Sequence, residues 1–532
     1  MFFSSYFVVK RGRMMRYKLF LLVLLIVLSS YSKTYYVSKS GNDNSAGTEA
    51  DAWLTLKKAA STMVAGDTLL VKTGNYQETV TVKKNGESGK YITFKVAPAA
   101  VCTVKNFIIS GSYVSVGGFH FFGQKNAYQA MINLSGDSCI IENNFFEHDT
   151  TSRSVFGIRF DQFDPPDSKG SSEYCIIRGN TFKHFMYLPL NIFGVGHLIE
   201  ENKLITIWHD CIRVWGHDHV IRKNLFEDIG DKSKYDIEHE DIIQVFGRHG
   251  FNSYNIVFEQ NVIRDCKDAQ IGILASEGAP KIEGWTFRNN IFSNIGKMMS
   301  ICMEKVRFYN NVFYKCTQNT GHTLNFANAM DGAHGAANYC EVKNNIFYLC
   351  GKDPASSQQG WYAFDTGLVG NESDHNFIAG KMPETEKTLV NLKGTDPNGN
   401  PRFNFLEANG INNGRDPRFI DPEKNDFRLQ EDSPARGKGL NLSASGFITN
   451  DFNGNLRQVN QNWDIGAFLY QDVGVYMPQK KLNNNHFNRL KTNTKEAVYS
   501  LSGRKILSVG RLATSGVVKC GIKKSVIISI KK

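Results

Sequence analysis

The sequence predicts an all-β fold, a right-handed parallel β-helix (a solenoid), with an N-terminal helical cap and a small β-rich C-terminal appendage. One short phrase recurs along the chain: apolar residues, one or two polar residues, an asparagine, and an apolar pair. The shortest steps between successive copies are 21 or 22 residues. Three short strands per coil, with loops of variable length inserted at fixed corners, produce this spacing.

The recurring asparagine marks one corner of each coil. Its successive steps are 36, 22, 22, 37, 29, 21 and 34 residues. A side-chain amide at a tight corner can bond to the backbone and to the same amide in the coils above and below. We therefore expect a ladder of stacked asparagines, and unrelated surface loops would not give this period. The ladder consists of Asn144, Asn180, Asn202, Asn224, Asn261, Asn290, Asn311 and Asn345, and the repeat weakens after it through Asn376.

The two ends of the chain have different compositions. Ala52–Met63 has helical apolar spacing and is predicted to cover the first coil. Basic residues, the apolar run Leu19–Leu28 and small residues are typical of a signal peptide, here residues 1–32. The run is short for a stable membrane anchor, which is the alternative. The predicted β-helix domain is 33–470, followed by a linker at 471–496 and an appendage at 497–532.

The net charge of +11 is concentrated at the two ends of the chain. Residues 1–33 carry +6 and residues 480–532 carry +12, which leaves −7 on the body. Binding of nucleic acid by a general basic field is therefore not expected. The ten cysteines include no CxxC pair, so neither a zinc cluster nor a redox motif is indicated. We expect a monomer without stable membrane insertion.

Two segments carry a resemblance to known families. YYVSKSGNDNSAGT through GNYQETVTV (Tyr35–Val82) resembles the opening of pectate-lyase-like β-helix proteins, and Asp416–Tyr470 resembles the segment that closes many of them. The tail Val498–Lys532 is similar to the sorting domain of proteins secreted by Bacteroidetes-type bacteria. The resemblance implies a secreted or cell-surface (or periplasmic) polysaccharide-active protein. The polygalacturonase motifs, the calcium cluster of one pectate lyase family and the alginate lyase motifs are not found, so site residues rest on geometry.

Alignment of the coils predicts two outward rows on one strand face. The first row is Asn133, Arg159, Asn191, Arg213 and Gln244, and the second is Ser135, Asp161, Phe193, Trp215 and Phe246. Polar groups flanked by aromatic rings are suited to gripping a sugar chain. The predicted substrate-binding residues are Arg159, Asn191, Gln244, Trp215, Phe246 and Asp161.

Ionisable residues gather on two neighbouring coils, WHDCIRVWG and HEDIIQVFG. Matching Ile212 to Ile243 stacks Asp210 on Asp241, His209 on Glu240, and Arg213 on Gln244. Two close carboxylates either share a proton or bind a cation, for which Ca²⁺ with Asp210, Glu240 and Asp241 as ligands is the candidate. In the alternative interpretation both aspartates cap the strand turn through backbone amides.

These residues predict an enzyme that cleaves an acidic, uronate-containing glycan by β-elimination. The proposed catalytic residues are His239, Asp241, Arg213, Asp210, His209 and Lys267, with His239, Arg213 or Lys267 as the base. Hydrolysis by paired carboxylates from Asp210, Asp241, Glu240 and Asp161 is one alternative. A glycan-binding adhesin without catalysis is another, since it would need the aromatic rows but no stacked ionisable groups.

Overall fold

The computed structural model describes residues 32–471 with several gaps, together with two short strands near the C-terminus. The gaps are 127, 149–153, 161–171, 231–239, 248–250, 277–280, 318–321, 329–334, 352–360, 366, 380–393, 396–400, 404–406, 412–415 and 447–449. The two strands are β40 (Ala497–Tyr499) and β41 (Lys505–Ser508). Among the described residues, no helix is long and apolar enough to cross a membrane.

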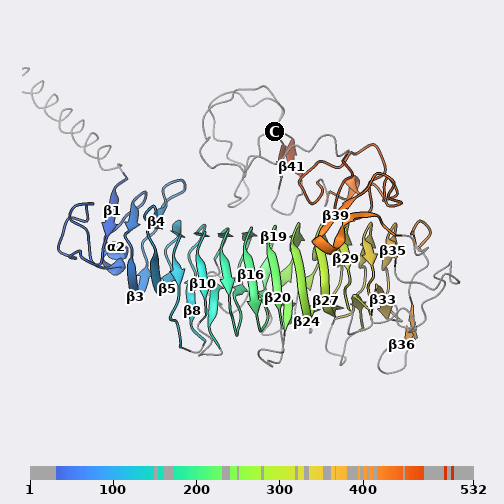
Figure 1. The fold of residues 1–532 in the computed structure, drawn as a ribbon, viewed down its shortest axis with the longest axis horizontal. Coiled ribbons are helices and arrows are strands. Elements are labelled where there is room, and N and C mark those ends of the chain that lie inside the picture. The colour runs from blue at the N-terminus through green and yellow to red at the C-terminus, as the bar shows by residue number, and fades with distance from the viewer. Residues whose placement is uncertain are drawn as a thin grey trace, which may run out of the picture.

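The predicted parallel β-helix is confirmed: short strands stack coil upon coil along the long axis (Figure 1). The first face is a 13-stranded parallel sheet. Its strands are β1 (Thr34–Val37), β2 (Thr68–Val71), β4 (Ile92–Val96), β6 (Val114–Gly117), β9 (Ile140–Glu142), β12 (Ile176–Arg178), β15 (Leu198–Glu200), β19 (Val220–Arg222), β23 (Val257–Glu259), β26 (Thr286–Arg288), β28 (Arg307–Tyr309), β31 (Glu341–Lys343) and β34 (Glu372–Asp374).

The second and third faces are joined through long strands that continue around a corner. Four strands contribute to both faces: β3 (Gly74–Val82), β5 (Cys102–Ile109), β24 (Val262–Ala275) and β27 (Ile291–Cys302). The second face adds β7 (His120–Phe121), β10 (Phe145–Glu147), β13 (Thr181–Lys183), β16 (Lys203–Ile207), β20 (Leu225–Ile229), β29 (Val312–Tyr314), β32 (Ile346–Tyr348) and β35 (Phe377–Ala379). The third face adds β8 (Ala130–Leu134), β11 (Phe156–Phe160), β14 (Leu190–Ile192), β17 (Ile212–Val214), β21 (Asp241–Val245), β30 (Leu324–Phe326) and β33 (Tyr362–Asp365).

The core is built from inward side chains that meet their counterparts in the next coil. Strand alternation places one apolar side chain of each short strand inside. Phe121, Phe146 and Phe182 stack with ring centroids 4.6 Å apart at each step. All three rings are fully buried. The register of parallel pairing thus aligns like residues, which reinforces the register through packing.

The asparagine ladder is confirmed along its whole predicted length and extends to Asn376. Each Nδ2 donates to the Oδ1 of the next asparagine at 2.9–3.2 Å. The same Oδ1 also accepts the backbone N–H of the preceding asparagine in the ladder. Asn224 Oδ1, for example, accepts the N–H of Asn202 at 2.9 Å. The residue before each ladder asparagine has a positive φ, for example Lys223 at 55°. That left-handed residue turns the chain sharply, and the amides satisfy the corner's backbone groups.

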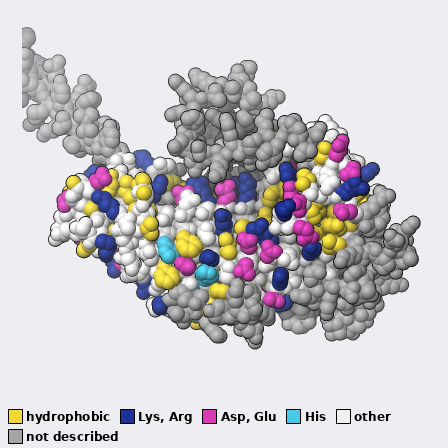
Figure 2. Space-filling view, in the orientation of Figure 1, with side chains coloured by type: hydrophobic (Ala, Val, Ile, Leu, Met, Phe, Trp, Pro, Cys, Tyr) yellow, Lys and Arg dark blue, Asp and Glu magenta, His cyan; other side chains and the backbone are white. Residues whose placement is uncertain are grey.

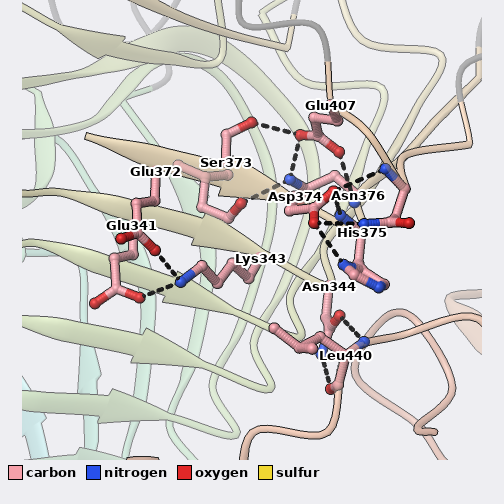
Figure 3. A network of polar contacts seen from close by, with 12 residues as sticks. Glu341, Lys343, Asn344, Glu372, Ser373, Asp374, His375, Asn376, Glu407 and Leu440 are labelled. Atoms are coloured by element: carbon pink, nitrogen blue, oxygen red, sulfur yellow. Dashed lines mark hydrogen bonds and ion pairs between the residues drawn. The ribbon is translucent and has the colours of Figure 1, made fainter. Parts of the chain in front are cut away.

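Glu407 occupies the position that a further ladder asparagine would take (Figure 3). Its Oε1 accepts hydrogen bonds from Asn376 Nδ2 and Ser373 Oγ, both at 2.6 Å, and from the Tyr362 hydroxyl. Its Oε2 accepts the backbone N–H of Asn376 at 2.9 Å. A carboxylate only accepts, so it satisfies the last donors of the ladder without requiring another coil.

The predicted N-terminal cap is a helix, α2 (Leu56–Thr62), which is shorter than the segment Ala52–Met63. Thr55 is its N-cap and accepts the N–H of Lys58 at 3.1 Å, which fixes the start of the helix. Leu56, Ala59 and Ala60 are buried against the first coils. The helix therefore covers the apolar end of the stack, as expected.

Residues 416–471 form a lobe that folds back along the outside of the later coils (Figure 1, orange). The lobe contains β38 (Phe419–Asp421), η1 (Pro422–Lys424), β39 (Asp426–Leu429) and η2 (Ser443–Ser445). Its Phe427 and Ile465 pack with Ile291, Val312 and Ile346 of the second face. The remaining short strands are β18 (Gly216–His217), β22 (Ser253–Tyr254), β25 (Ile282–Glu283), β36 (Gly394–Thr395) and β37 (Pro401–Phe403).

The predicted signal peptide lies outside the described residues apart from Ser32, as does nearly all of the linker and most of the C-terminal appendage. Of the appendage, β40 and β41 are described and form an antiparallel pair. The domain boundaries of 32/33 and 470/471 stay predictions.

Candidate functional site

The first predicted row runs along the third face in one unbroken register. Strand pairing places Asn133 beside Arg159, Arg159 beside Asn191, Asn191 beside Arg213, and Arg213 beside Gln244. We call these five residues the polar row. It is bounded by Ile108 on one side and Ile273 on the other. The alignment of the coils therefore predicted the correct neighbours.

Asp210 lies just before β17, and Asp241 is the first residue of β21. The two residues are in contact. The backbone N–H of Asp241 donates to Asp210 Oδ1 at 3.2 Å. Arg213 donates from Nε and Nη2 to Asp210 Oδ2 at 2.8 and 2.5 Å. Asp210 is fully buried, so its carboxylate is held by an arginine and a backbone amide. The capping interpretation is thus correct for one oxygen of Asp210, while the other belongs to an ion pair.

Asp241 is the acid with the strongly altered pKa. It is only 2% exposed, and Gln244 Nε2 donates to its Oδ2 at 2.9 Å. Burial raises the pKa of Asp241 well above its usual value, and the Asp210 and Glu240 carboxylates add to the rise. Arg213 and Lys297 oppose it only in part. Such an environment favours the protonated form of the carboxyl group, the form that can donate a proton.

A cation that the sequence did not single out lies beside these acids. Lys297 Nζ is 3.3 Å from Glu240 Oε2. The register explains its place, since Asp241 pairs with Gln270 and Gln270 pairs with Lys297. Extending the alignment by two coils would have found it. Lys267, one of the three predicted candidates for the base, is exposed at the irregular corner of β24.

His209 is oriented by the backbone of its neighbour. Its Nδ1 accepts the Asp210 N–H at 2.7 Å, and its ring lies 4.7 Å from that of Tyr187. A neutral imidazole whose Nδ1 accepts carries its proton on Nε2. This contact favours the tautomer with the proton on Nε2, with Nδ1 occupied as an acceptor.

The three predicted calcium ligands do not fit a cation as they stand. Asp210 Oδ2 is taken by Arg213, Asp241 Oδ2 by Gln244, and Glu240 Oε2 by Lys297. Within the described parts of the chain, no group of three or more His, Cys, Asp or Glu side chains is placed to hold a metal ion. Neighbouring positive groups disfavour Ca²⁺, which prefers uncompensated oxygen ligands.

The prediction that Trp215 and Phe193 present open rings to a sugar is wrong. Both side chains are 4% exposed and belong to the core. Phe251 packs on them, with ring centroids 5.1 Å from Phe193 and 6.3 Å from Trp215. The reason is that β14 and β17 end one residue earlier, so strand alternation no longer sets the direction of these side chains. Phe246 stays partly buried, with the Arg213 guanidinium 5.6 Å from its ring centre.

The amides of the polar row are buried although they lie on outward positions. Asn133, Asn191 and Gln244 are 7%, 5% and 6% exposed. Their side-chain oxygens are buried and accept no hydrogen bond. Arg159 is partly exposed and donates from Nη1 to the Tyr128 carbonyl at 3.0 Å. Buried polar atoms without partners are uncommon and mark places where a ligand or a water is accommodated.

Two predicted site residues, Asp161 and His239, lie outside the described residues.

Over the described surface, basic and acidic side chains are interleaved on the face that Figure 2 shows.

The fold and the register of its strands define a right-handed parallel β-helix protein. Residues 167–313 match the family model described as "Right handed beta helix region". One curated relative is an uncharacterised protein, YwoF, of Bacillus subtilis (strain 168), which is 38% identical over 80 residues. That match covers 15% of this chain and 16% of the relative, so the chain spans about a sixth of the relative's length.

Several solved structures are similar to the chain at low identity. A complex of XylC with xylose has a TM-score of 0.47 at 13% identity, covering 82% of this chain and 98% of that one. Pectate lyase Pel9A has a TM-score of 0.43 at 14% identity, with 83% and 97% covered. The GH136 lacto-N-biosidase from Eubacterium ramulus has a TM-score of 0.44 at 11% identity, with 65% and 68% covered.

Proposed function

We propose that this protein cleaves glycosidic bonds of an acidic polysaccharide bound along the polar row, with Asp241 as the proton donor to the leaving oxygen. The observation that carries the proposal is the Asp241 carboxyl group. It is buried, its pKa is raised, and it lies one coil from the Asp210 side chain, which Arg213 holds in place at 2.5 Å. Two neighbouring carboxyl groups in such different environments can take different roles in catalysis.

Arg159 and Arg213 suit a substrate that carries carboxylates. Both guanidinium groups lie on the row, and a positive group beside a uronate stabilises the charge that develops when the adjacent C–H loses its proton. Elimination then forms a double bond in the sugar as the glycosidic bond breaks, and Asp241 protonates the departing oxygen.

Elimination also needs a base, and the contacts of Arg213 argue against one of the three predicted candidates. Arg213 donates two N–H groups to Asp210 and an arginine stays protonated, so it is not the base. Lys267 and His239 remain, and His239 lies outside the described residues.

Hydrolysis is the second candidate, because the same coils hold a protonated carboxyl group beside further carboxylates. Asp241 would act as the acid, and Glu240, the residue before it, would activate a water molecule. In both reactions Gln244 must move away from Asp241 Oδ2 when a sugar binds, since it covers that oxygen.

The test is Asp241→Asn in the full chain, assayed on a panel of acidic polysaccharides. We expect turnover to fall by about 10²–10⁴-fold, the usual contribution of a general acid. Wild-type activity should fall as the pH rises through the raised pKa of Asp241. Ultraviolet absorbance of an unsaturated product identifies elimination, and new reducing ends without it identify hydrolysis.

The matched control is Asp218→Asn, a carboxylate paired with His217 away from the row, which should keep full activity. Full activity in Asp241→Asn would remove the site assignment. Binding without any product would leave the adhesin interpretation. Because the donors do not suit calcium, activity should survive a chelator, and loss of activity there would show that a metal is required.

We further propose that residues 1–32 direct export and that the mature protein acts as a monomer outside the cytoplasm. The basic, apolar and small-residue regions of this segment support the first statement. Cleavage at residue 32 or nearby, found by N-terminal sequencing of the mature protein, tests it.

A further inference from the structure

The polar row alternates strictly between amides and cations over five coils. In order along the stack it is amide, arginine, amide, arginine, amide, and an isoleucine closes it at each end. Parallel strands lie about 4.8 Å apart, so the two arginines are separated by roughly 10 Å. Like functional groups therefore recur with every second coil.

The amide positions lack donors for their oxygens. Asn133 Oδ1, Asn191 Oδ1 and Gln244 Oε1 are all buried without a hydrogen-bond partner. A buried acceptor gains from any donor that reaches it. Sugar hydroxyl and N-acetyl N–H groups are such donors, whereas a carboxylate has no hydrogen to donate to these oxygens. These three positions thus fit a neutral sugar.

The arginine positions keep donors for an acid. Arg213 uses Nε and Nη2 for Asp210, which leaves Nη1, and Arg159 uses Nη1 for the Tyr128 carbonyl, which leaves Nε and Nη2. Both side chains are partly exposed. Among the described residues, Arg159 forms no ion pair, and its remaining N–H groups suit a carboxylate.

We propose that the glycan on the polar row carries a carboxylate on every second sugar, with a neutral sugar between. A glycan that advances by one coil spacing per sugar would match the two-coil repeat of the arginines with a two-sugar repeat. The proposal rests on the proposed function only in taking the polar row as the substrate site. It adds the charge pattern of the substrate.

The experiment measures binding by the full-length Asp241→Asn protein, in which we expect degradation of the ligand to be slowed by about 10²–10⁴-fold. Fragments of equal length from alternating polymers (hyaluronan, chondroitin and a rhamnogalacturonan backbone) are compared with polygalacturonate and alginate, which carry a carboxylate on every sugar. We expect at least one alternating polymer to bind about tenfold more tightly than both uniform ones. Tighter binding of a uniform polymer than of all alternating ones would overturn the proposal.

Arg159→Gln tests the role of the remote cation. It should weaken binding of the preferred alternating fragment about 10- to 100-fold, as loss of a hydrogen bond to a charged group does. Arg159→Lys should restore part of this loss. The control is Arg178→Gln on the first face, where Arg178 pairs with Glu142, and it should bind normally. Unchanged affinity in Arg159→Gln would also overturn the proposal.

The outcomes separate this inference from the proposed function. If wild-type protein cleaves a uniform polymer in an Asp241-dependent way, the proposed function stands and the alternating pattern is wrong. If no acidic polymer is bound or cleaved, both are wrong.

Discussion

Single residues in this fold carry unusual protonation states because each coil buries polar groups between its neighbours. Asp241 is one example, and the stacked pair His197 and His219 is another. Their rings lie 4.9 Å apart and nearly parallel, and both are fully buried. The Nδ1 atoms accept the backbone N–H groups of Cys175 and His197, so both rings are neutral structural acceptors.

This histidine pair predicts acid sensitivity. Burial lowers the pKa of His197 from 6.5 to about 4, and it lowers the pKa of His219 well below 6.5. The unfolded chain therefore takes up protons first, so the stability is complete above pH 6.5 and is lost as the pH falls toward 4. For His197 the loss is roughly 3 kcal/mol.

Urea unfolding at a series of pH values measures this loss. The double variant His197→Gln, His219→Gln keeps an acceptor for each amide but cannot titrate, so its stability should vary less over this range. An equal slope in both proteins would contradict the assignment.

At the scale of elements, the asparagine corner holds one coil to the next. Asn224 links three coils, because it bonds to Asn202, to Asn261 and to the Ile199 carbonyl. All of these groups are buried. The corner therefore depends on an amide that both donates and accepts, which other residue types of similar size do not supply.

Asn224→Ala should destabilise the protein by about 3 kcal/mol or more, since it leaves several buried backbone and amide groups without partners. The matched control is Lys223→Ala at the same corner, where the side chain is exposed. Thermal or denaturant unfolding compares the two. A loss below about 1 kcal/mol in Asn224→Ala would mean that strand pairing alone holds the corner.

At the scale of the whole molecule, the stack is completed by the lobe at residues 416–471. Arg457 is the polar centre of this contact: its Nη2 donates to Asn289 Oδ1 and to the Gly466 carbonyl, both at 3.0 Å. Burial lowers its pKa to about 10, which still leaves it charged at neutral pH. The residues before the ladder asparagines also form hydrogen bonds with the lobe. Asn344 donates to the Leu440 carbonyl and accepts the Leu440 N–H.

Arg457→Ala should loosen the lobe, because it removes a buried donor from three acceptors, at a loss of about 3 kcal/mol or more. Exposure of the apolar patch around Val312 and Ile346 should then increase dye binding and aggregation. Lys438→Ala, an exposed change in the same lobe, should behave as wild type. Limited proteolysis measures the release of the lobe from the coils. If the variant resists proteolysis as well as the wild type does, apolar contacts alone hold the lobe in place.

The sequence by itself determined the solenoid, the asparagine ladder and the strand register, because each depends on a local pattern repeated coil after coil. Asp210 therefore fell beside Asp241, although 31 residues separate them. Only the tertiary structure decided what neighbouring coils and loops do to these residues. Phe251 covers Trp215, Lys297 arrives beside Glu240, and burial raises the pKa of Asp241. The physical reason is that periodicity fixes which residues are neighbours, while burial and charge compensation depend on everything that surrounds them.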